Sequence, residues 1–242
     1  MILAHRVILI TGAAGGLGST AAIEFARQGA IVILLDKNLP KLEKVYDAIL
    51  EQGGIEPILY PFDLAGASEN DYSELAQRID EKYGMLHGLV HAAVELSAFT
   101  PLIQFGTKDW GHTFNVNVNA PFILTRELLP VMQKAPKASI VFISDSSARQ
   151  APAYSGAYGV SKVAMEGLAS VLSQELEGGQ KIRVNTLIPC PIDSPLRRRV
   201  YPAEDKSLLP SMASLNPIFC YLLSDESIDV TGQLIDAQLF LN

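Results

Sequence analysis

The sequence predicts an α/β fold in which a parallel sheet of about seven strands is covered by helices on both faces. Short apolar runs such as Ile31-Val-Ile-Leu-Leu35 lack the polar alternation of a half-exposed strand, which is typical of strands buried on both sides. These runs alternate with amphipathic stretches along the whole chain. Such strand–helix alternation favours a parallel sheet with right-handed crossovers.

The expected elements follow in chain order. Strands are predicted at residues 7–11, 31–36, 55–61, 88–92, 139–144, 183–188 and 232–236. Helices are predicted at residues 17–28, 40–52, 70–83, 110–133, 157–176 and 211–223. No repeat, low-complexity tract or linker marks a boundary, so we expect a single domain over residues 1–242.

One segment, residues 190–210, does not fit the alternation. Four prolines exclude a long helix or an interior strand there: Pro191, Pro195, Pro202 and Pro210. An irregular loop of this length inside a compact domain usually has a function. We therefore expect a substrate lid at about residues 190–210.

Composition excludes several classes of protein. The chain is 48% hydrophobic and 19% charged, a globular balance, and its net charge of −7 argues against a nucleic-acid surface. Cys190 and Cys220 are too few for a disulfide framework, and no His/Cys cluster has metal-ligand spacing. His5 and Arg6 interrupt the apolar N-terminus, and no apolar run approaches the ~20 residues of a membrane span. We expect a soluble, cytoplasmic protein without a metal, a nucleic-acid partner or a membrane contact.

A glycine-rich loop, TGAAGGLG at residues 11–18, lies between the first predicted strand and the first predicted helix. Glycines in this context let the backbone turn sharply and approach a pyrophosphate, whose charge then meets the helix N-terminus. The loop residues expected to line a dinucleotide are Gly12, Ala14, Gly16, Leu17 and Gly18. The loop therefore predicts a doubly wound, Rossmann-type sheet that binds a dinucleotide.

Acidic residues at two strand ends refine this prediction. Asp36 ends the second strand, where a carboxylate can accept both hydroxyls of an adenosine ribose and repel a 2′-phosphate. Lys37 could soften that rejection, so NAD is favoured and NADP is not excluded. Asp63, followed by Leu64, ends the third strand and is placed to meet an adenine amino group. An ordinary turn role is an equal alternative for Asp36 and for Asp63.

Tyr158 and Lys162 are four residues apart at the start of a predicted helix and therefore share one helical face. A free phenol has a pKa of about 10 and transfers protons poorly at pH 7. An ammonium about 4 Å away favours the phenolate by about 4 kcal/mol at an effective dielectric of about 20. The pair is a candidate acid/base, although its spacing alone is common among surface residues.

The glycine loop together with Tyr158-x-x-x-Lys162 resembles the single-domain branch of the short-chain dehydrogenase/reductase family over essentially the whole chain. Val116-Asn117-Val118, Arg183-Val-Asn185 with Pro189, and Thr231-Gly-Gln233 match further family positions. The resemblance implies a secondary alcohol and a ketone or aldehyde interconverted by hydride transfer with NAD or NADP. It also implies a homodimer or homotetramer, which the apolar faces of the helices at 110–133 and 157–176 would suit.

The resemblance also assigns roles. Tyr158 would exchange a proton with the substrate oxygen, and Lys162 would lower the tyrosine pKa and hold the nicotinamide ribose. Asn117 would anchor a water in a proton relay, and Pro189 would border the cofactor.

The chain departs from the family at the substrate-binding serine, normally thirteen residues before the tyrosine. Counting back from Tyr158 gives Asp145, flanked by Ser144 and Ser146. An ionised aspartate accepts but cannot donate a hydrogen bond, and it would raise the pKa of Tyr158. A one-residue shift could bring Ser146 into the position, Asp145 could be protonated or paired with Lys or Arg elsewhere, or the site could be weak. We favour Ser146, which predicts that Ser146→Ala lowers turnover at least about 100-fold while Asp145→Ser does not.

Further departures lie after the fourth and sixth strands. His91 and Ala92 stand in place of the family's paired asparagines, near the adenosine side of the cofactor, although a satisfied core histidine is the simpler interpretation. Cys190 replaces a glycine and would crowd the nicotinamide or the substrate, and Ser194 could take the family's threonine role.

In the lid, Arg197-Arg-Arg199 is either a solvated charged face or a clamp for an anionic group. The glycine loop matches the family, whereas Asp145, His91 and Cys190 depart from it. A second function therefore stays open: a dinucleotide-binding sensor or structural subunit with weak catalysis.

Overall fold

The computed structural model describes residues 1–97, 99–146, 152–178 and 181–240. Its strands form one sheet in the order β3-β2-β1-β4-β5-β6-β7, with every neighbouring pair parallel. The strands are β1 (Val7–Thr11), β2 (Ile31–Asp36), β3 (Ile58–Pro61), β4 (Gly88–His91), β5 (Ala138–Ile143), β6 (Ile182–Ile188) and β7 (Leu234–Asp236). The predicted seven-stranded parallel sheet is confirmed, although β3 and β7 begin later than expected.

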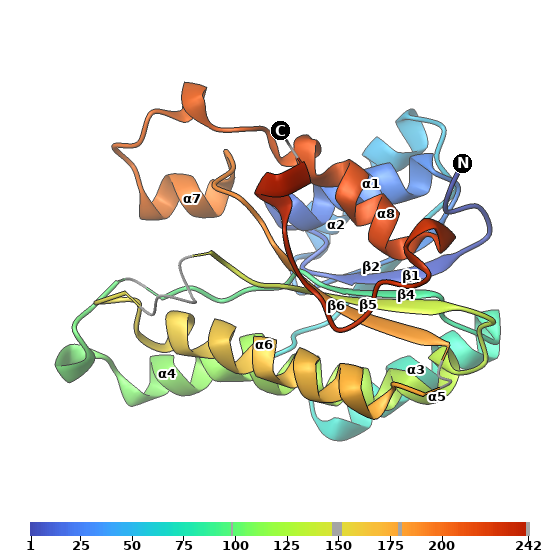
Figure 1. Cartoon of the computed structure of the whole chain (residues 1–242), viewed down its shortest axis with the longest axis horizontal. Coiled ribbons are helices and arrows are strands. Elements are labelled where there is room, and N and C mark those ends of the chain that lie inside the picture. The colour runs from blue at the N-terminus through green and yellow to red at the C-terminus, as the bar shows by residue number, and fades with distance from the viewer. Residues whose placement is uncertain (98, 147–151, 179–180, 241–242) are drawn as a thin grey trace.

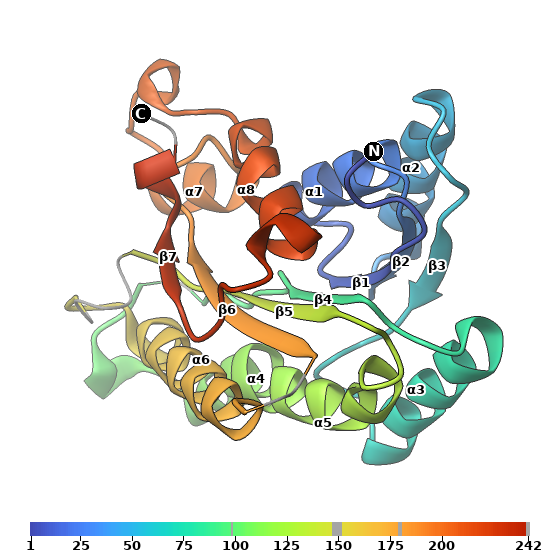
Figure 2. The ribbon, with the colours of Figure 1, turned by 45° about the vertical axis from the view of Figure 1, so that its right-hand side comes forward.

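Helices cover both faces of the sheet (Figure 2). The α-helices are α1 (Gly16–Arg27), α2 (Leu39–Glu51), α3 (Glu69–Tyr83), α4 (Thr107–Phe114), α5 (Ala120–Met132), α6 (Gly156–Glu175), α7 (Pro195–Val200) and α8 (Asn216–Leu223). Single 3-10 turns are η1 (Leu102–Gln104), η4 (Lys206–Leu208), η5 (Met212–Leu215), η6 (Asp225–Ser227) and η7 (Ala237–Phe240). Among the described residues, no helix combines the length and apolarity needed to cross a membrane.

Each face of the sheet has its own apolar core. On one face α1, α2 and α8 lie together (Figure 2). Phe25 of α1 meets Phe219 of α8 edge to face, with 6.2 Å between ring centroids. On the other face α3, α5 and α6 cover the sheet through buried residues such as Tyr72, Leu128 and Met165. These two cores explain why the central strands are apolar on both sides.

The prediction of one continuous helix over residues 110–133 is wrong in detail. The structure divides it into α4, a π-helical turn η2 (Asn115–Asn119) and α5. The N–H of Ala120 donates to the carbonyl of Asn115, five residues back, which is the mark of a π turn. Apolar periodicity could not reveal one extra residue in one turn, although π turns are frequent at functional sites.

The strand order reverses between β1 and β4, which lie side by side although β2 and β3 separate them in the chain. In open parallel sheets, ligands bind beyond the carboxyl ends of the strands at such a reversal. The loops after β1, β2, β4, β5 and β6 all leave from this edge. In Figure 1, the segment that contains α7 and the turn before α4 extend beyond the same end of the sheet.

Candidate active site

The glycine loop leaves β1 in a conformation that side chains would obstruct. Gly12 has φ +66°, and a Cβ there would lie 2.7 Å from the Cα of Ala93. A Cβ on Gly18 would lie 2.2 Å from the carbonyl oxygen of Gly12, so the first turn of α1 can fold against the loop only without one. Gly15 precedes α1 without a side-chain cap on the first N–H groups. This bare helix start and tight backbone cradle fit the pyrophosphate of a dinucleotide.

Asp36 lies at the end of β2 and is tied to the same loop. One carboxylate oxygen accepts the N–H of Ala14 at 3.2 Å and the other accepts the N–H of Asn38 at 3.0 Å. Lys37 beside it is exposed. The structure therefore brings Asp36 next to the glycine loop, as a ribose-binding carboxylate requires.

Other predicted cofactor residues have local structural partners. Asp63 is exposed and closes a turn, because its side chain accepts the N–H of Ala65 and its carbonyl accepts that of Ala67. The carbonyl of Leu64 accepts the hydroxyl of Tyr72 at 2.8 Å. These contacts support the turn role and leave a cofactor role for Asp63 and Leu64 as a prediction.

The exit of β4 is tied to the glycine loop, while the side chain of His91 points the other way. The Thr11 hydroxyl accepts the N–H groups of Ala92 and Ala93, both at 3.1 Å. The His91 ring is buried, hydrogen-bonded to Thr125 at 2.9 Å and stacked on Phe142. Burial lowers its pKa to about 3, so the ring is neutral. A satisfied core histidine accounts for these observations.

Tyr158 is buried in the first turns of α6, and its hydroxyl donates a 2.5 Å hydrogen bond to Asp145 Oδ2. Burial and the neighbouring Asp145 carboxylate raise the tyrosine pKa well above its ordinary value. The expected lowering of this pKa by Lys162 is therefore not found in this arrangement. Ser146, which we favoured for the serine position, is exposed, and Asp145 instead faces the phenol. A catalytic role for Ser146 stays a prediction that this geometry does not favour.

Lys162 lies one turn further along α6, and only 4% of it is exposed. Its ammonium donates to the carbonyl of Ile143 at 2.7 Å and lies 5.8 Å from the centroid of the Tyr158 ring. Burial lowers its pKa to about 8, and the charges of Asp145 and Glu166 partly offset that effect. Glu166 also accepts the hydroxyl of Ser144 at 2.5 Å. The site therefore holds a buried lysine that interacts electrostatically with two acids.

Asn117 connects the π turn to α6. Its amide donates to the Ser161 hydroxyl and to the Glu95 carbonyl, both at 2.9 Å, and its side-chain oxygen accepts the Glu95 N–H at 2.7 Å. Ser161 in turn donates to the carbonyl of Tyr158 at 2.8 Å. These bonds fix the segment after β4, the π turn and α6 relative to one another. A role for Asn117 in a proton relay stays a prediction.

The lid predicted at 190–210 is anchored at both the cofactor loop and the site. A Cβ built on Gly16 would lie 2.7 Å from the ring of Pro195, so this proline rests on the glycine loop. Arg199 donates to the carbonyl of Leu96 at 2.8 Å, and Tyr201 lies near enough to Tyr158 to raise its pKa. Pro189, half-buried after β6, leads into this segment.

The lid arginines are engaged within the protein. Arg197 makes two 2.6 Å hydrogen bonds to Glu204, and Arg198 makes two to Asp193 at 2.5 and 2.6 Å. The anion-clamp hypothesis therefore finds no support in this arrangement.

Two departures from the family, Cys190 and Ser194, lie at the start of the lid. Burial raises the pKa of the Cys190 thiol, which disfavours a reactive thiolate. Ser194 caps α7 by accepting the N–H of Arg197 at 3.2 Å.

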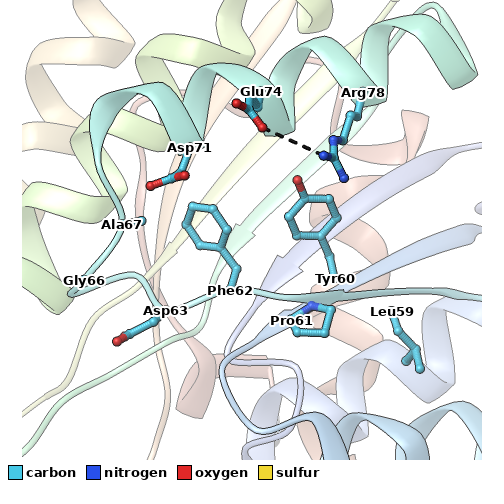
Figure 3. A pocket seen from close by; sticks show the side chains of 10 residues that line it. All are labelled: Leu59, Tyr60, Pro61, Phe62, Asp63, Gly66, Ala67, Asp71, Glu74 and Arg78. Carbon is cyan, nitrogen blue, oxygen red and sulfur yellow. Dashed lines mark ion pairs between the residues drawn. The ribbon is translucent and has the colours of Figure 1, made fainter.

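A cavity of about 530 Å³ lies between β3 and α3 (Figure 3). Tyr60 and Phe62 point toward α3, where Glu74 and Arg78 form a 3.8 Å ion pair, whereas Asp63 points away from them (Figure 3). The cavity contains none of the candidate catalytic residues. Among the residues that the structure describes, no group of three or more His, Cys, Asp or Glu could hold a metal ion.

Sequence reasoning missed Glu166 and Tyr201. Glu166 could have been found, because it lies four residues after Lys162 and so continues the Tyr158–Lys162 face by one turn. No sequence pattern pointed to Tyr201, because only the folding of residues 190–210 brings it near Tyr158.

The described geometry defines a class of protein: a doubly wound dinucleotide-binding domain with a buried tyrosine–lysine pair on α6, beside the carboxyl end of β5. Residues 6–205 match the short chain dehydrogenase family. The chain is 39% identical over 237 residues to the uncharacterised oxidoreductase YciK of Escherichia coli strain K12, covering 98% of this chain and 93% of YciK. It is 30% identical over 244 residues to the 3-oxoacyl-[acyl-carrier-protein] reductase FabG of Thermotoga maritima, covering 97% of each.

A solved structure shares the fold closely. A short chain dehydrogenase from Shigella flexneri, crystallised with NADP, superposes with a TM-score of 0.94 at 39% identity, covering 98% of this chain and 99% of that one. The chain therefore belongs to the short chain dehydrogenase family. Its relatives are oxidoreductases, and a nicotinamide dinucleotide is the cofactor that family and fold support.

Proposed function

We propose that this protein interconverts a secondary alcohol and a ketone or aldehyde on a small molecule by hydride transfer, using NAD in preference to NADP. The observation that carries the proposal is the buried Tyr158–Lys162 pair on α6, which is joined through Ser161 and Asn117 to the segment following β4. A dinucleotide bound with its pyrophosphate at the glycine loop would supply the redox chemistry through its nicotinamide. Tyr158 would hold the substrate oxygen, and Lys162 and Asn117 would fix the position of the phenol.

The preference for NAD rests on Asp36. Its carboxylate is held beside the glycine loop by the N–H of Ala14, where it can accept ribose hydroxyls and repel a 2′-phosphate. The Shigella flexneri relative was solved with NADP, which points the other way. We give more weight to Asp36 because it is a charge of this chain itself at the position where the two dinucleotides differ.

The function is tested with a panel of alcohols and carbonyl compounds and either dinucleotide. We expect turnover that falls by about 100-fold or more in Tyr158→Phe, because a positioned acid/base contributes that much. Tyr46→Phe is the matched control, since Tyr46 lies at the surface on α2. No turnover above background, or equal turnover in Tyr158→Phe, would contradict the proposal.

Cofactor choice is tested by thermal shift with NADH and NADPH at equal concentrations. The dinucleotide that binds more tightly raises the melting temperature more, because ligand binding to the folded state stabilises it. We expect the larger shift with NADH, and in Asp36→Gly the order reverses. A larger shift with NADPH in the unchanged protein would defeat the Asp36 argument.

A second function, a dinucleotide-binding sensor or structural subunit with weak catalysis, is favoured by one observation. The hydrogen bond to Asp145 uses the phenolic proton that a carbonyl substrate would need. Both functions require dinucleotide binding, but only the first requires Tyr158-dependent turnover.

We also propose a homodimer or homotetramer assembled through α5 and α6. Phe122 of α5 and Val160, Val163 and Val171 of α6 are exposed apolar side chains that such contacts would cover. Light scattering during size-exclusion chromatography measures the assembly, and Val163→Glu with Val171→Glu should shift it to the monomer.

A further inference from the structure

The hydrogen bond between Tyr158 and Asp145 has a definite direction. A carboxylate only accepts, so the phenol is the donor and its proton points at Asp145 Oδ2 across 2.5 Å. The phenolic oxygen can still accept a hydrogen bond. In this arrangement the oxygen of Tyr158 can accept a hydrogen bond from the hydroxyl of an alcohol. It cannot donate one to a ketone oxygen, because its proton is already donated to Asp145.

Charged groups from several elements surround this pair. Lys162 and Glu166 come from α6, and the lid contributes Arg197 with its partner Glu204, and Tyr201. Asp145 interacts electrostatically with both Lys162 and Arg197. Both are cations, and an ionised carboxylate beside them is the form that can take up a proton.

We propose that Asp145 is the terminal proton acceptor when this site oxidises an alcohol, receiving the proton from Tyr158 as the alcohol gives its own proton to the phenolic oxygen. The hydride leaves the alcohol carbon for the oxidised nicotinamide dinucleotide, the C–O bond becomes C=O, and one proton ends on the Asp145 carboxylate. Tyr158 begins and ends as a neutral phenol. This inference rests on the proposed function and deepens it: the favoured substrate carries a hydroxyl, and the favoured direction near neutral pH is dehydrogenation.

The alternative, a Tyr158 phenolate acting as the base, conflicts with the surroundings of the phenol. Burial and Asp145 both raise the tyrosine pKa, so the phenolate is scarce near neutral pH. A relay to Asp145 requires no phenolate. The reverse reaction would begin from a protonated Asp145, so carbonyl reduction should gain at lower pH.

The first experiment compares alcohol oxidation by the unchanged protein with that by Asp145→Asn, over pH 7 to 10. At pH 7 we expect a loss of about 100-fold or more, the usual contribution of a general base. The loss should shrink toward pH 10, because without Asp145 only the phenolate can act as the base, and the phenolate fraction rises with pH although burial still keeps the tyrosine pKa raised. Asp145→Glu keeps a carboxylate and should recover at least about tenfold over Asp145→Asn at pH 7. A loss that is constant with pH, or no recovery by glutamate, would indicate a merely structural role and overturn the proposal.

The second experiment reads the same bond without any cofactor. Phenolate absorbance is titrated with pH, and the spectrum of Tyr158→Phe is subtracted to isolate Tyr158 from the other tyrosines. In Asp145→Asn, the pKa of Tyr158 should fall, because the carboxylate that helps to raise it is gone while burial remains. Glu56→Gln is the matched control, because it removes the carboxylate from Tyr46 instead. An unmoved Tyr158 titration in Asp145→Asn, with the fold intact by melting, would overturn the coupling.

A third comparison separates Asp145 from the serine beside it. If Ser146→Ala lowers turnover about 100-fold while Asp145→Ser does not, Ser146 fills the family position and the inference is wrong. Failure of the proposed function appears differently, as an absence of Tyr158-dependent turnover in either direction. Tyr158-dependent turnover that is indifferent to Asp145→Asn removes the inference alone.

Discussion

Tyr158 and Tyr46 each donate a short hydrogen bond to a carboxylate, at 2.5 Å to Asp145 and 2.6 Å to Glu56. In the Tyr46 pair the hydrogen bond itself is the main cause of the raised tyrosine pKa, whereas burial is the main cause at Tyr158. Water can compete for the surface bond, but little water reaches Tyr158, which is 5% exposed. The same two functional groups therefore form a minor surface contact in one place and a candidate proton path in the other.

Two double-mutant cycles would measure this difference in stability directly. Asp145→Asn with Tyr158→Phe should give a coupling free energy of about 1.5–3 kcal/mol, as expected for a buried hydrogen bond to a charged group. Glu56→Gln with Tyr46→Phe should give a clearly smaller coupling, because solvent replaces the lost bond. Chemical denaturation of the four variants in each cycle supplies the numbers. Equal couplings would break the comparison and remove burial as the deciding factor.

The buried pair also differs from the exposed pair in having Lys162 beside it. The pKa of Lys162 in the folded protein is about 8, below that of a free lysine, so the unfolded chain holds more protons between these values. Stability should therefore rise with pH from about 8 to about 9.5, by about 1–2 kcal/mol relative to Lys162→Met. Above about pH 10 the raised pKa of Tyr158 makes stability fall as the pH rises, so the comparison is kept below that pH.

Lys134, exposed and paired with Asp80 at 2.6 Å, provides the control for that measurement. Lys134→Met should leave the slope of stability against pH unchanged in the same window. Identical slopes for the unchanged protein and Lys162→Met would show that Lys162 is not held below its ordinary pKa.

The smallest expected effect concerns Glu166, which accepts the Ser144 hydroxyl and whose charge supports the protonated form of Lys162. Glu166→Gln should lower the pKa of Lys162 further, by a few tenths of a unit to about one unit. The pH at which stability begins to rise should move below 8 accordingly. A shift to higher pH would mean that Glu166 does not act on Lys162 through its charge.

The sheet and the cofactor loop could be predicted because short-range patterns determine them. Apolar runs, strand–helix alternation and the glycine spacing identified β1, α1 and the parallel sheet, and helical spacing alone placed Tyr158 beside Lys162. Asp145 and Ser146 could not be separated this way, because they follow β5 in a loop. One residue of slippage there changes which side chain meets the phenol, and the fold decides it.

The lid shows a second limit. Its prolines correctly excluded a long helix, but the partners of its arginines depend on how the segment folds back on itself. Arg197 pairs with Glu204 seven residues later, and Arg199 reaches the carbonyl of Leu96 far along the chain. Sequence spacing carries no information on such contacts.

The π turn at Asn115–Asn119 has a consequence for how the site tolerates change in chain length. Each residue of an α-helix turns the chain by about 100°, so one surplus residue sets the rotational phase between α4 and α5. Deleting a single residue would restore a regular helix and rotate all of α4 about its axis. The stacked rings of Trp110 and Phe114 would then face a new direction, and Asn117 would lose Glu95 and Ser161. Length in this short stretch is thus as much a determinant of the site as the identity of its side chains.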